Sequence, residues 1–290
     1  MSYNTRMLRK LKNIITDLHS LRNIFFRGEE HTYRPTILFR SEVHPVANRP
    51  SLWIQRRTAR EPIDKNESPV SAQRNVFREL DLDYDKGKEH LSTMMEVNDA
   101  SSEHFILFSA LSLKWKDRRN QRILEIGTYS GETTALLSRL FPDSSIKTID
   151  LPDDDKDALA PLRGYTKERE KNLKQSNIEF LQVDSFHLMS RDIEKFDLIW
   201  IDGDHSAPTV ITDLYCAYHL LESDGIIAYD DVFVNEILER TWENAAIKTL
   251  EAYRKRRLIN YWLVHKRLTT TNSALHKFVA VVKKAHIPEE

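Results

Sequence analysis

A histidine and several aspartates in the second half of the chain have the types and spacing that catalysis requires. The segment FDLIWIDGDH ends an apolar run with Asp202, Asp204 and His205, and the later segment IIAYDDV ends another with Asp230 and Asp231. If these apolar runs are neighbouring parallel strands, their carboxyl ends meet at one edge of a sheet. The acids and the histidine then face a common site.

Crowded carboxylates repel one another unless they are protonated or bind a cation. Oxygen ligands without cysteine favour Mg²⁺ or a similar hard ion, so we expect a divalent cation among these converging acids. Such an ion lowers the pKa of a coordinated hydroxyl, and the His205 imidazole, with an ordinary pKa of roughly 6.5, can accept the proton. The alternative is that Asp202 touches only a cofactor and that His205 faces solvent.

The stretch Arg122–Asp150 predicts the scaffold for this site, because it reads as a strand, a glycine turn, a helix and a second strand. Gly127 and Gly131 allow positive φ and a close approach of the backbone to a ligand where the helix begins. Their G-x-x-x-G spacing differs from the dinucleotide fingerprint, which disfavours a pyrophosphate cofactor. Glu125 favours a cationic cofactor, and Asp150 can accept hydrogen bonds from ribose hydroxyls.

Strand and helix patterns alternate regularly after this point. We expect strands at 122–126, 145–150, 178–183, 196–201 and 225–230, and helices at 132–140, 165–174, 186–191 and 207–221. A long helix at 235–257 precedes two further runs, 259–265 and 277–283, that predict an antiparallel hairpin at the sheet edge. The alternation predicts an α/β fold with a doubly wound, mostly parallel, seven-stranded sheet.

The segment LEIGTYSGETTALLSRL, followed by TIDLP, resembles the first motif of class I S-adenosylmethionine (SAM)-dependent methyltransferases and its acidic partner. The resemblance covers residues 91–290 and implies a Rossmann-like methyltransferase fold that ends in the antiparallel hairpin. It also implies that the glycine turn lines the methionine and ribose of SAM, and that the end of the third strand lies near the adenine amino group. The cofactor-binding residues implied in this way are Glu125, Gly127, Tyr129, Ser130, Gly131, Asp150, Asp184, Ser185 and Asp202.

The pattern D-G-x-H followed by an acidic pair resembles the metal-dependent O-methyltransferases of natural products, particularly those acting on macrolide sugars. This resemblance implies that Asp202, Asp230 and Asp231 bind Mg²⁺ and that His205 is the general base. Some relatives carry glutamate where this chain has Asp230, and the role of Asp204 is open. The expected function is therefore SAM-dependent O-methylation of a small-molecule hydroxyl.

Three other functions fit parts of the same sequence. A metal-independent N- or C-methyltransferase needs the cofactor residues but not Asp230 and Asp231, and its activity would survive chelation. A nicotinamide-dependent oxidoreductase would bind NAD in place of SAM, although the middle glycine of the fingerprint is missing. A non-catalytic binding module on the same fold would keep its role after His205→Ala and Asp202→Ala.

The first ninety residues match no pattern that we can name, and we place the domain boundary near residue 90. Residues 1–60 contain 12 Lys and Arg but 4 acids, and apolar residues between 8 and 25 recur at helical steps. This basic amphipathic helix is expected to pack on the main domain or to join two subunits, rather than to act as a membrane-surface helix or a transit peptide. Residues 32–70 read as a proline-punctuated arm, 81–88 as a charged turn, and 91–113 as a helix.

Overall composition limits the partners and the compartment. The net charge of the 290-residue chain is −1, so we expect no nucleic-acid partner. No apolar run has the roughly 20 residues that a membrane span needs. The one cysteine, Cys216, excludes an internal disulfide and fits a reducing compartment, and a cytoplasmic protein is expected.

Overall fold

A seven-stranded sheet runs through the part of the chain that the structure describes, in the order β3-β2-β1-β4-β5-β7-β6. The structure is a computed structural model that describes residues 68–98, 101–190, 194–234, 245–268 and 276–285, all within one compact unit. The strands are β1 (Arg122–Ile126), β2 (Ser145–Asp150), β3 (Ile178–Gln182), β4 (Phe196–Ile201), β5 (Leu221–Val234), β6 (Ile259–His265) and β7 (His276–Lys284). The pairs β5–β7 and β6–β7 are antiparallel, and the other four pairs are parallel. The doubly wound, Rossmann-like methyltransferase fold with a terminal hairpin is confirmed.

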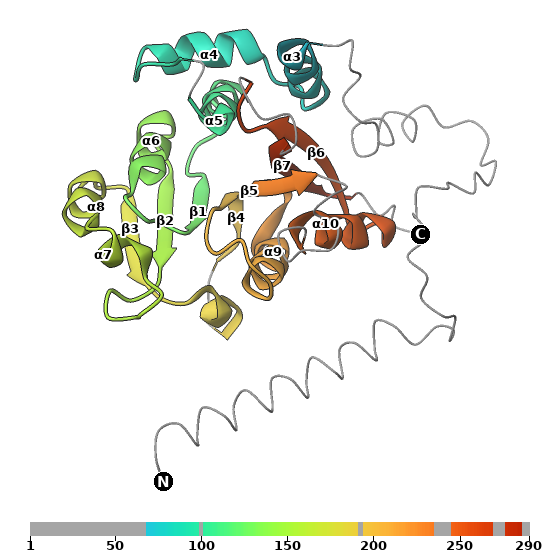
Figure 1. The fold of residues 1–290 in the computed structure, drawn as a ribbon. Helices are drawn as coiled ribbons and strands as arrows, with labels where there is room; N and C mark the ends of the chain where they lie inside the picture. Colours follow the sequence, from blue (N-terminus) through green and yellow to red (C-terminus); the bar gives the residue numbers. More distant parts are fainter. Residues whose placement is uncertain (1–67, 99–100, 191–193, 235–244, 269–275, 286–290) are drawn as a thin grey trace, which may run out of the picture. The chain divides into compact units, whose positions relative to one another are not determined.

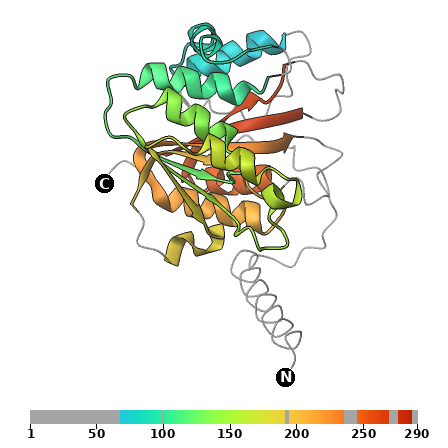
Figure 2. The same cartoon turned by 90° about the vertical axis from the view of Figure 1, so that its left-hand side faces the viewer.

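Helices cover both faces of this sheet (Figures 1 and 2). One face carries α5 (Glu103–Lys114) and α6 (Glu132–Leu140), and its core includes Trp200 and Phe108. The opposite face carries α9 (Thr209–Leu220), α10 (Ala245–Lys255) and the 3-10 helix η1 (Ser185–Ser190), and its core includes Tyr229. Strands that are buried on both faces need mostly apolar runs, and β1 and β4 both have such runs. Two short helices, α7 (Leu159–Leu162) and α8 (Thr166–Asn172), lie between β2 and β3.

Two helices upstream of the expected boundary at residue 90 pack on the same core. They are α3 (Pro69–Glu79) and α4 (Tyr84–Ser92), and Phe77 and Tyr84 belong to the apolar cluster that contains Trp200. The expected charged turn at 81–88 is wrong in its second half, because the Asp83 carboxylate accepts the Lys86 N–H and starts α4 there. The expected continuous helix at 91–113 is divided between the end of α4 and α5.

Several expectations lie outside the described residues. These are the basic helix and most of the arm, in residues 1–67, and the beginning of the long helix expected at 235–257, in residues 235–244. Among the helices that the structure describes, none has both the length and the hydropathy to cross a membrane.

Gln73 of α3 joins the N-terminal helices to the edge strand β6. Its side-chain amide accepts the His265 N–H at 2.9 Å and donates to the His265 carbonyl at 3.3 Å, as a neighbouring strand would. Gln73 is fully buried and also donates to the Glu103 carboxylate at 3.1 Å. Because buried polar groups need partners, this pairing fixes the end of β6 against the first turn of α5.

Candidate active site

The carboxyl ends of the central strands form one continuous edge. The Asp202 N–H donates to the Ile126 carbonyl at 2.8 Å, and the Gly127 N–H donates to the Ile149 carbonyl at 2.9 Å. The backbone pairing of β4 with β1 and of β1 with β2 therefore continues one residue into the loops. Open parallel sheets bind their ligands at this edge. The loops after β1 and β4 thus reach the site in fixed positions.

The glycine turn between β1 and α6 is tied to Asp150 at the end of β2. Gly127 and Gly131 have φ of +100° and +74°, and Tyr129 has φ of +48°. The Tyr129 N–H donates to Asp150 Oδ2 at 2.7 Å, and the Leu151 N–H donates to Asp150 Oδ1 at 2.8 Å. Each oxygen of a carboxylate can accept a second hydrogen bond, so Asp150 keeps acceptor capacity for a ligand.

Glu125 is a residue of β1, and its side chain contacts Thr134 of α6 and Thr148 of β2. Its side chain is buried, and its Oε2 accepts the Thr134 hydroxyl and, at 2.6 Å, the Thr148 hydroxyl. Its Oε1 is buried and has no hydrogen-bond partner among the described residues. Burial raises the pKa of Glu125 to about 8, against the lowering effect of the two threonines. The role of Glu125 in cofactor binding stays a prediction.

The remaining cofactor-binding residues predicted from the sequence lie at the same edge or beside it. Asp184 follows β3, and its Oδ1 accepts the Phe186 N–H at 2.9 Å, which starts η1. Ser185 is buried at the first position of η1. The Ser130 carbonyl accepts the Asn172 side-chain amide at 2.9 Å, which fixes the glycine turn against α8. None of these contacts tests the predicted roles of the residues.

The predicted base and two of the predicted metal ligands come together. Asp202, His205 and Asp230 each offer one ligand atom, and the three atoms lie within 4.8 Å of one another. His205 Nε2 is 3.5 Å from Asp202 Oδ1 and 3.9 Å from Asp231 Oδ2. The imidazole nitrogen therefore points into the carboxylate cluster. The sequence prediction that these acids and His205 share one edge agrees with the positions of the side chains.

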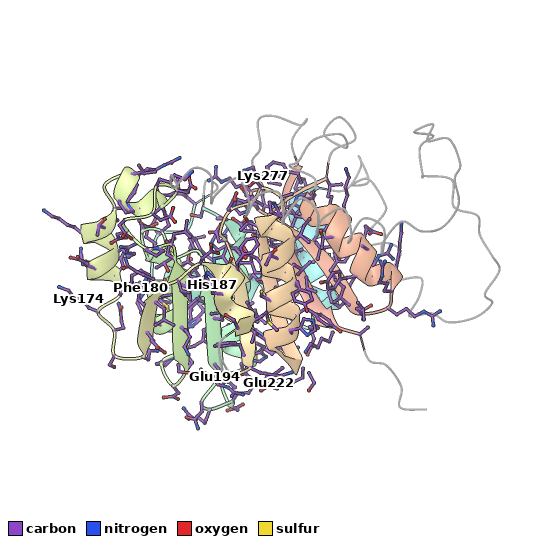
Figure 3. The ribbon with its side chains drawn as sticks, turned by 90° about the horizontal axis from the view of Figure 1, so that it is seen from below. Lys174, Phe180, His187, Glu194, Glu222 and Lys277 are labelled. Atoms are coloured by element: carbon purple, nitrogen blue, oxygen red, sulfur yellow. The ribbon has the colours of Figure 1, made fainter. Side chains whose placement is uncertain are left out.

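Two lysines that the sequence interpretation overlooked complete the cluster. Lys266 Nζ is 2.5 Å from Asp230 Oδ2 and 2.6 Å from Asp231 Oδ1. Lys277 Nζ is 2.8 Å from Asp231 Oδ2. Figure 3 shows Lys277 at the opposite end of the sheet from Glu194 and Glu222. The signal in the sequence was a basic residue directly after β6 and another near the start of β7, which is common on protein surfaces.

The cluster has strongly perturbed protonation equilibria. Burial raises the pKa of Asp202 to about 7. Burial acts in the same direction on Asp231, but Lys266 and Lys277 outweigh it and lower the pKa of Asp231 to about 2. Burial opposes protonation of His205, yet Asp202 and Asp231 outweigh burial and raise its pKa. Shifts of this kind, clustered at a sheet edge, are typical of functional sites.

Asp204, whose role the sequence left open, stabilises the loop that carries His205. Its Oδ1 accepts the Ser206 N–H at 2.9 Å, and its Oδ2 accepts the Ser206 hydroxyl at 2.8 Å. Asp204 therefore closes a local turn one residue after Gly203 and so restricts the position of His205.

The residues present fit both groups that the sequence implies. For SAM, the positive φ of the two glycines lets the backbone of the turn approach a ligand, and Asp150 keeps acceptor capacity. The buried Glu125 Oε1 has no hydrogen-bond partner among the described residues. For a divalent cation, the donor set is two carboxylates and one imidazole, and Asp230 Oδ1 is buried without a hydrogen-bond partner in the described part of the chain. Asp231 differs, because both of its oxygens already contact lysines.

The central part of the chain matches the model of a known family. Residues 124–232 match a family model described as a methyltransferase domain. The match spans β1 to β5, and so contains the glycine turn and the acidic cluster. Together with the strand order, it supports a class I SAM-dependent methyltransferase. No curated protein sequence matches the chain.

Solved structures with similar folds are distant in sequence. The O-methyltransferase TomG from Streptomyces achromogenes, in complex with SAM, is 16% identical, with 81% of this chain and 95% of that chain covered and a TM-score of 0.44. A putative O-methyltransferase from Klebsiella pneumoniae is 17% identical, with coverages of 78% and 100% and a TM-score of 0.45. A putative caffeoyl-CoA O-methyltransferase from Staphylococcus aureus is 13% identical, with coverages of 81% and 98% and a TM-score of 0.47.

Proposed function

We propose that this protein is a SAM-dependent methyltransferase that methylates the hydroxyl of a small molecule, with His205 as the general base. The observation that carries the proposal is the contact between the two halves of the site. A Cβ atom on Gly127 would lie 2.2 Å from the Asp202 carbonyl oxygen, so the glycine turn touches the loop that holds His205. A cofactor on the turn and an acceptor beside His205 are therefore neighbours.

The proposed reaction is an in-line displacement. SAM, when bound, supplies an electrophilic methyl group, and the C–S bond breaks as the new C–O bond forms. His205 Nε2 accepts the proton that the acceptor hydroxyl releases, and the imidazolium is stabilised by Asp202 at 3.5 Å. General-base catalysis of this kind contributes roughly 10²- to 10⁴-fold in rate. Asp150 and the turn hold the cofactor, and fixed positions of both reactants add to the acceleration.

We also propose that the cluster can bind a divalent cation through Asp202 and Asp230. A divalent cation, when bound, lowers the pKa of a coordinated hydroxyl and fixes its orientation. Asp231, the third predicted ligand, supplies an oxygen only if one of its lysine contacts opens. In this arrangement His205 is either a ligand or the base, and we assign it the role of base because its Nε2 has two carboxylate neighbours that stabilise the protonated form.

Calorimetric titration with SAM is the primary test of this function. We expect saturable binding at one site, with competition by S-adenosylhomocysteine, and no binding of NAD. A folded protein that binds NAD but not SAM would overturn the assignment.

Methyl transfer to a panel of hydroxylated small molecules, measured with labelled SAM, then tests the acceptor class. The same assay with Mg²⁺ and with a chelator tests the cation. Activity that is restored by Mg²⁺ after chelation supports a cation-assisted transfer. Activity that is indifferent to chelation shows that the transfer is metal-independent and overturns the cation proposal.

A further inference from the structure

Lys266 bridges the two adjacent carboxylates of the acidic cluster. Its Nζ lies 2.5 Å from Asp230 Oδ2 and 2.6 Å from Asp231 Oδ1, and its side chain is only 18% exposed. Asp230 itself is 1% exposed. A buried carboxylate without a compensating charge is costly, and this ammonium group supplies the compensating charge for Asp230.

The strand geometry shows that the bridge is built into the fold. Side chains of consecutive residues on a regular strand point to opposite faces, so neighbouring aspartates do not normally reach one ammonium group. Here the pairing of β5 with β7 shifts register between Tyr229 and Val232, and Asp231 has φ of +50°. This bulge brings the carboxylates of Asp230 and Asp231 to the same side chain.

The backbone of Lys266 is held from two sides. Its N–H donates to the Lys277 carbonyl at 3.0 Å, and its own carbonyl accepts the Glu103 N–H, at the start of α5, at 2.9 Å. Strand β7 lies between β6 and β5, a separation of roughly 10 Å for two strand spacings. The Lys266 side chain, its short contact and the aspartate side chain together span this distance. The Gln73 pairing with His265 fixes the strand end from which Lys266 starts.

The charges of Asp230 and Asp231 are balanced without a metal ion, because these two carboxylates face the two ammonium groups of Lys266 and Lys277. A divalent ion would approach the partnerless Asp230 Oδ1 and Asp202, and would meet an ammonium group already bound to the other oxygen of Asp230. The ion and the lysine therefore compete for the same carboxylates.

We infer that Lys266 is the resident cation of this site, and that a divalent ion binds tightly only when the Lys266 ammonium group is displaced from Asp230 and Asp231. The inference rests on the cation ligands of the proposed function and adds a positioning residue that limits their affinity for metal. Lys266 thereby orients both carboxylates when no ion is bound.

Mn²⁺ binding tests this competition without any assay of activity. Titration of the full-length protein with MnCl₂, followed by calorimetry and by the loss of the free-ion electron paramagnetic resonance signal, is compared between wild type, Lys266→Met and Lys266→Arg. We expect Lys266→Met to bind Mn²⁺ about tenfold more tightly or better, which corresponds to about 1.4 kcal/mol. Lys266→Arg, which keeps the charge, should resemble wild type.

Lys277→Met is the matched control for a general electrostatic effect. Lys277 is 42% exposed and forms its ion pair with Asp231 rather than with Asp230, so its removal should raise Mn²⁺ affinity less than removal of Lys266. Equal affinity in wild type and Lys266→Met, or an equal gain in Lys277→Met, would overturn the inference. An absence of Mn²⁺ binding in every folded variant would overturn it too, while SAM binding by the same samples would leave the methyltransferase assignment intact.

Stability gives a second readout if the variant folds poorly. Removal of Lys266 leaves Asp230 buried without its counter-ion, so Lys266→Met should melt at a lower temperature than wild type. Mn²⁺ should raise the melting temperature of Lys266→Met more than that of wild type, because it binds the folded state of the variant more tightly. If Lys266→Met does not fold even with Mn²⁺, Lys266→Gln, which can still donate to the carboxylates, replaces it in the Mn²⁺ titration. Equal Mn²⁺ affinity in Lys266→Gln and wild type would then reject the inference.

Discussion

Gly127 and Asp202 are in contact through their backbones, although 75 residues of sequence separate them. A Cβ atom at position 127 would lie 2.2 Å from the Asp202 carbonyl oxygen, closer than any side chain can approach. The first loop of the sheet therefore needs glycine because the fourth strand delivers its own loop to the same point. This contact couples the glycine turn to the loop that carries Asp202 and His205.

The substitution Gly127→Ala tests that coupling. We expect it to lower the free energy of unfolding by about 3 kcal/mol, because it adds a collision to the cost of a left-handed backbone. Gly164→Ala is a matched control, since Gly164 has φ of +77° but no atom within 4 Å of the added Cβ. The control should lose only about 1 kcal/mol. Urea denaturation of both variants measures the difference, and equal losses would show that the contact with Asp202 is unimportant.

His205→Gln tests the proposed base. Glutamine keeps a polar side chain of similar size but cannot accept the proton, so kcat should fall by roughly 10²- to 10⁴-fold. SAM affinity should be unchanged, because the glycine turn is intact. His187→Gln is the control, because His187 is an exposed residue of η1 and does not belong to the acidic cluster. A His205→Gln enzyme with wild-type kcat would exclude His205 as the base.

Substitutions of Asp150 test the predicted cofactor site. Hydrogen bonds to a charged acceptor are each worth about 1.5–3 kcal/mol, so Asp150→Ala should weaken SAM binding by roughly tenfold to a hundredfold. Asp150→Asn retains one oxygen for the Tyr129 N–H and should lose less. Asp154→Ala, in the exposed loop after β2, should bind SAM normally. Calorimetry provides all four dissociation constants, and wild-type affinity in Asp150→Ala would contradict the predicted role.

The raised pKa of Glu125 predicts that stability depends on pH. Burial raises the pKa of Glu125 from an ordinary value of 4.5 to about 8. The folded state therefore holds a proton that the unfolded state has lost between these values, so stability is highest below the ordinary pKa and falls as pH rises towards 8. The limiting slope for one group is about 1.4 kcal/mol per pH unit.

Glu125→Gln should remove this contribution, because an amide does not titrate. Urea denaturation of the SAM-free protein between pH 5 and pH 8, a range set by the ordinary and raised pKa values, measures both slopes. We expect the variant to lose less stability than wild type over this range. Parallel curves for the two proteins would show that Glu125 is ionised in the folded state.

Local sequence patterns predicted most of the sheet. The expected bounds of β1, β2, β4 and β6 agree with the structure. For the central strands β1 and β4 the reason is burial on both faces, which requires mostly apolar runs. The helical patterns were less informative near residue 83, where one aspartate cap decides where α4 begins. Propensity alone does not distinguish a charged turn from an exposed helix of nine residues with few apolar side chains.

The sequence by itself determined the α/β class, the glycine turn and the edge at which Asp202, His205, Asp230 and Asp231 meet. The reason is that alternating strands and helices make the strands parallel, so that their carboxyl ends lie at one edge. Only the tertiary structure decided which atoms of those residues are available. It placed Glu125 among threonines, and it brought Lys266 across β7 to two aspartates on β5. Such contacts depend together on a bulge, the register of a hairpin and the length of a side chain, and no local sequence pattern predicts any of these.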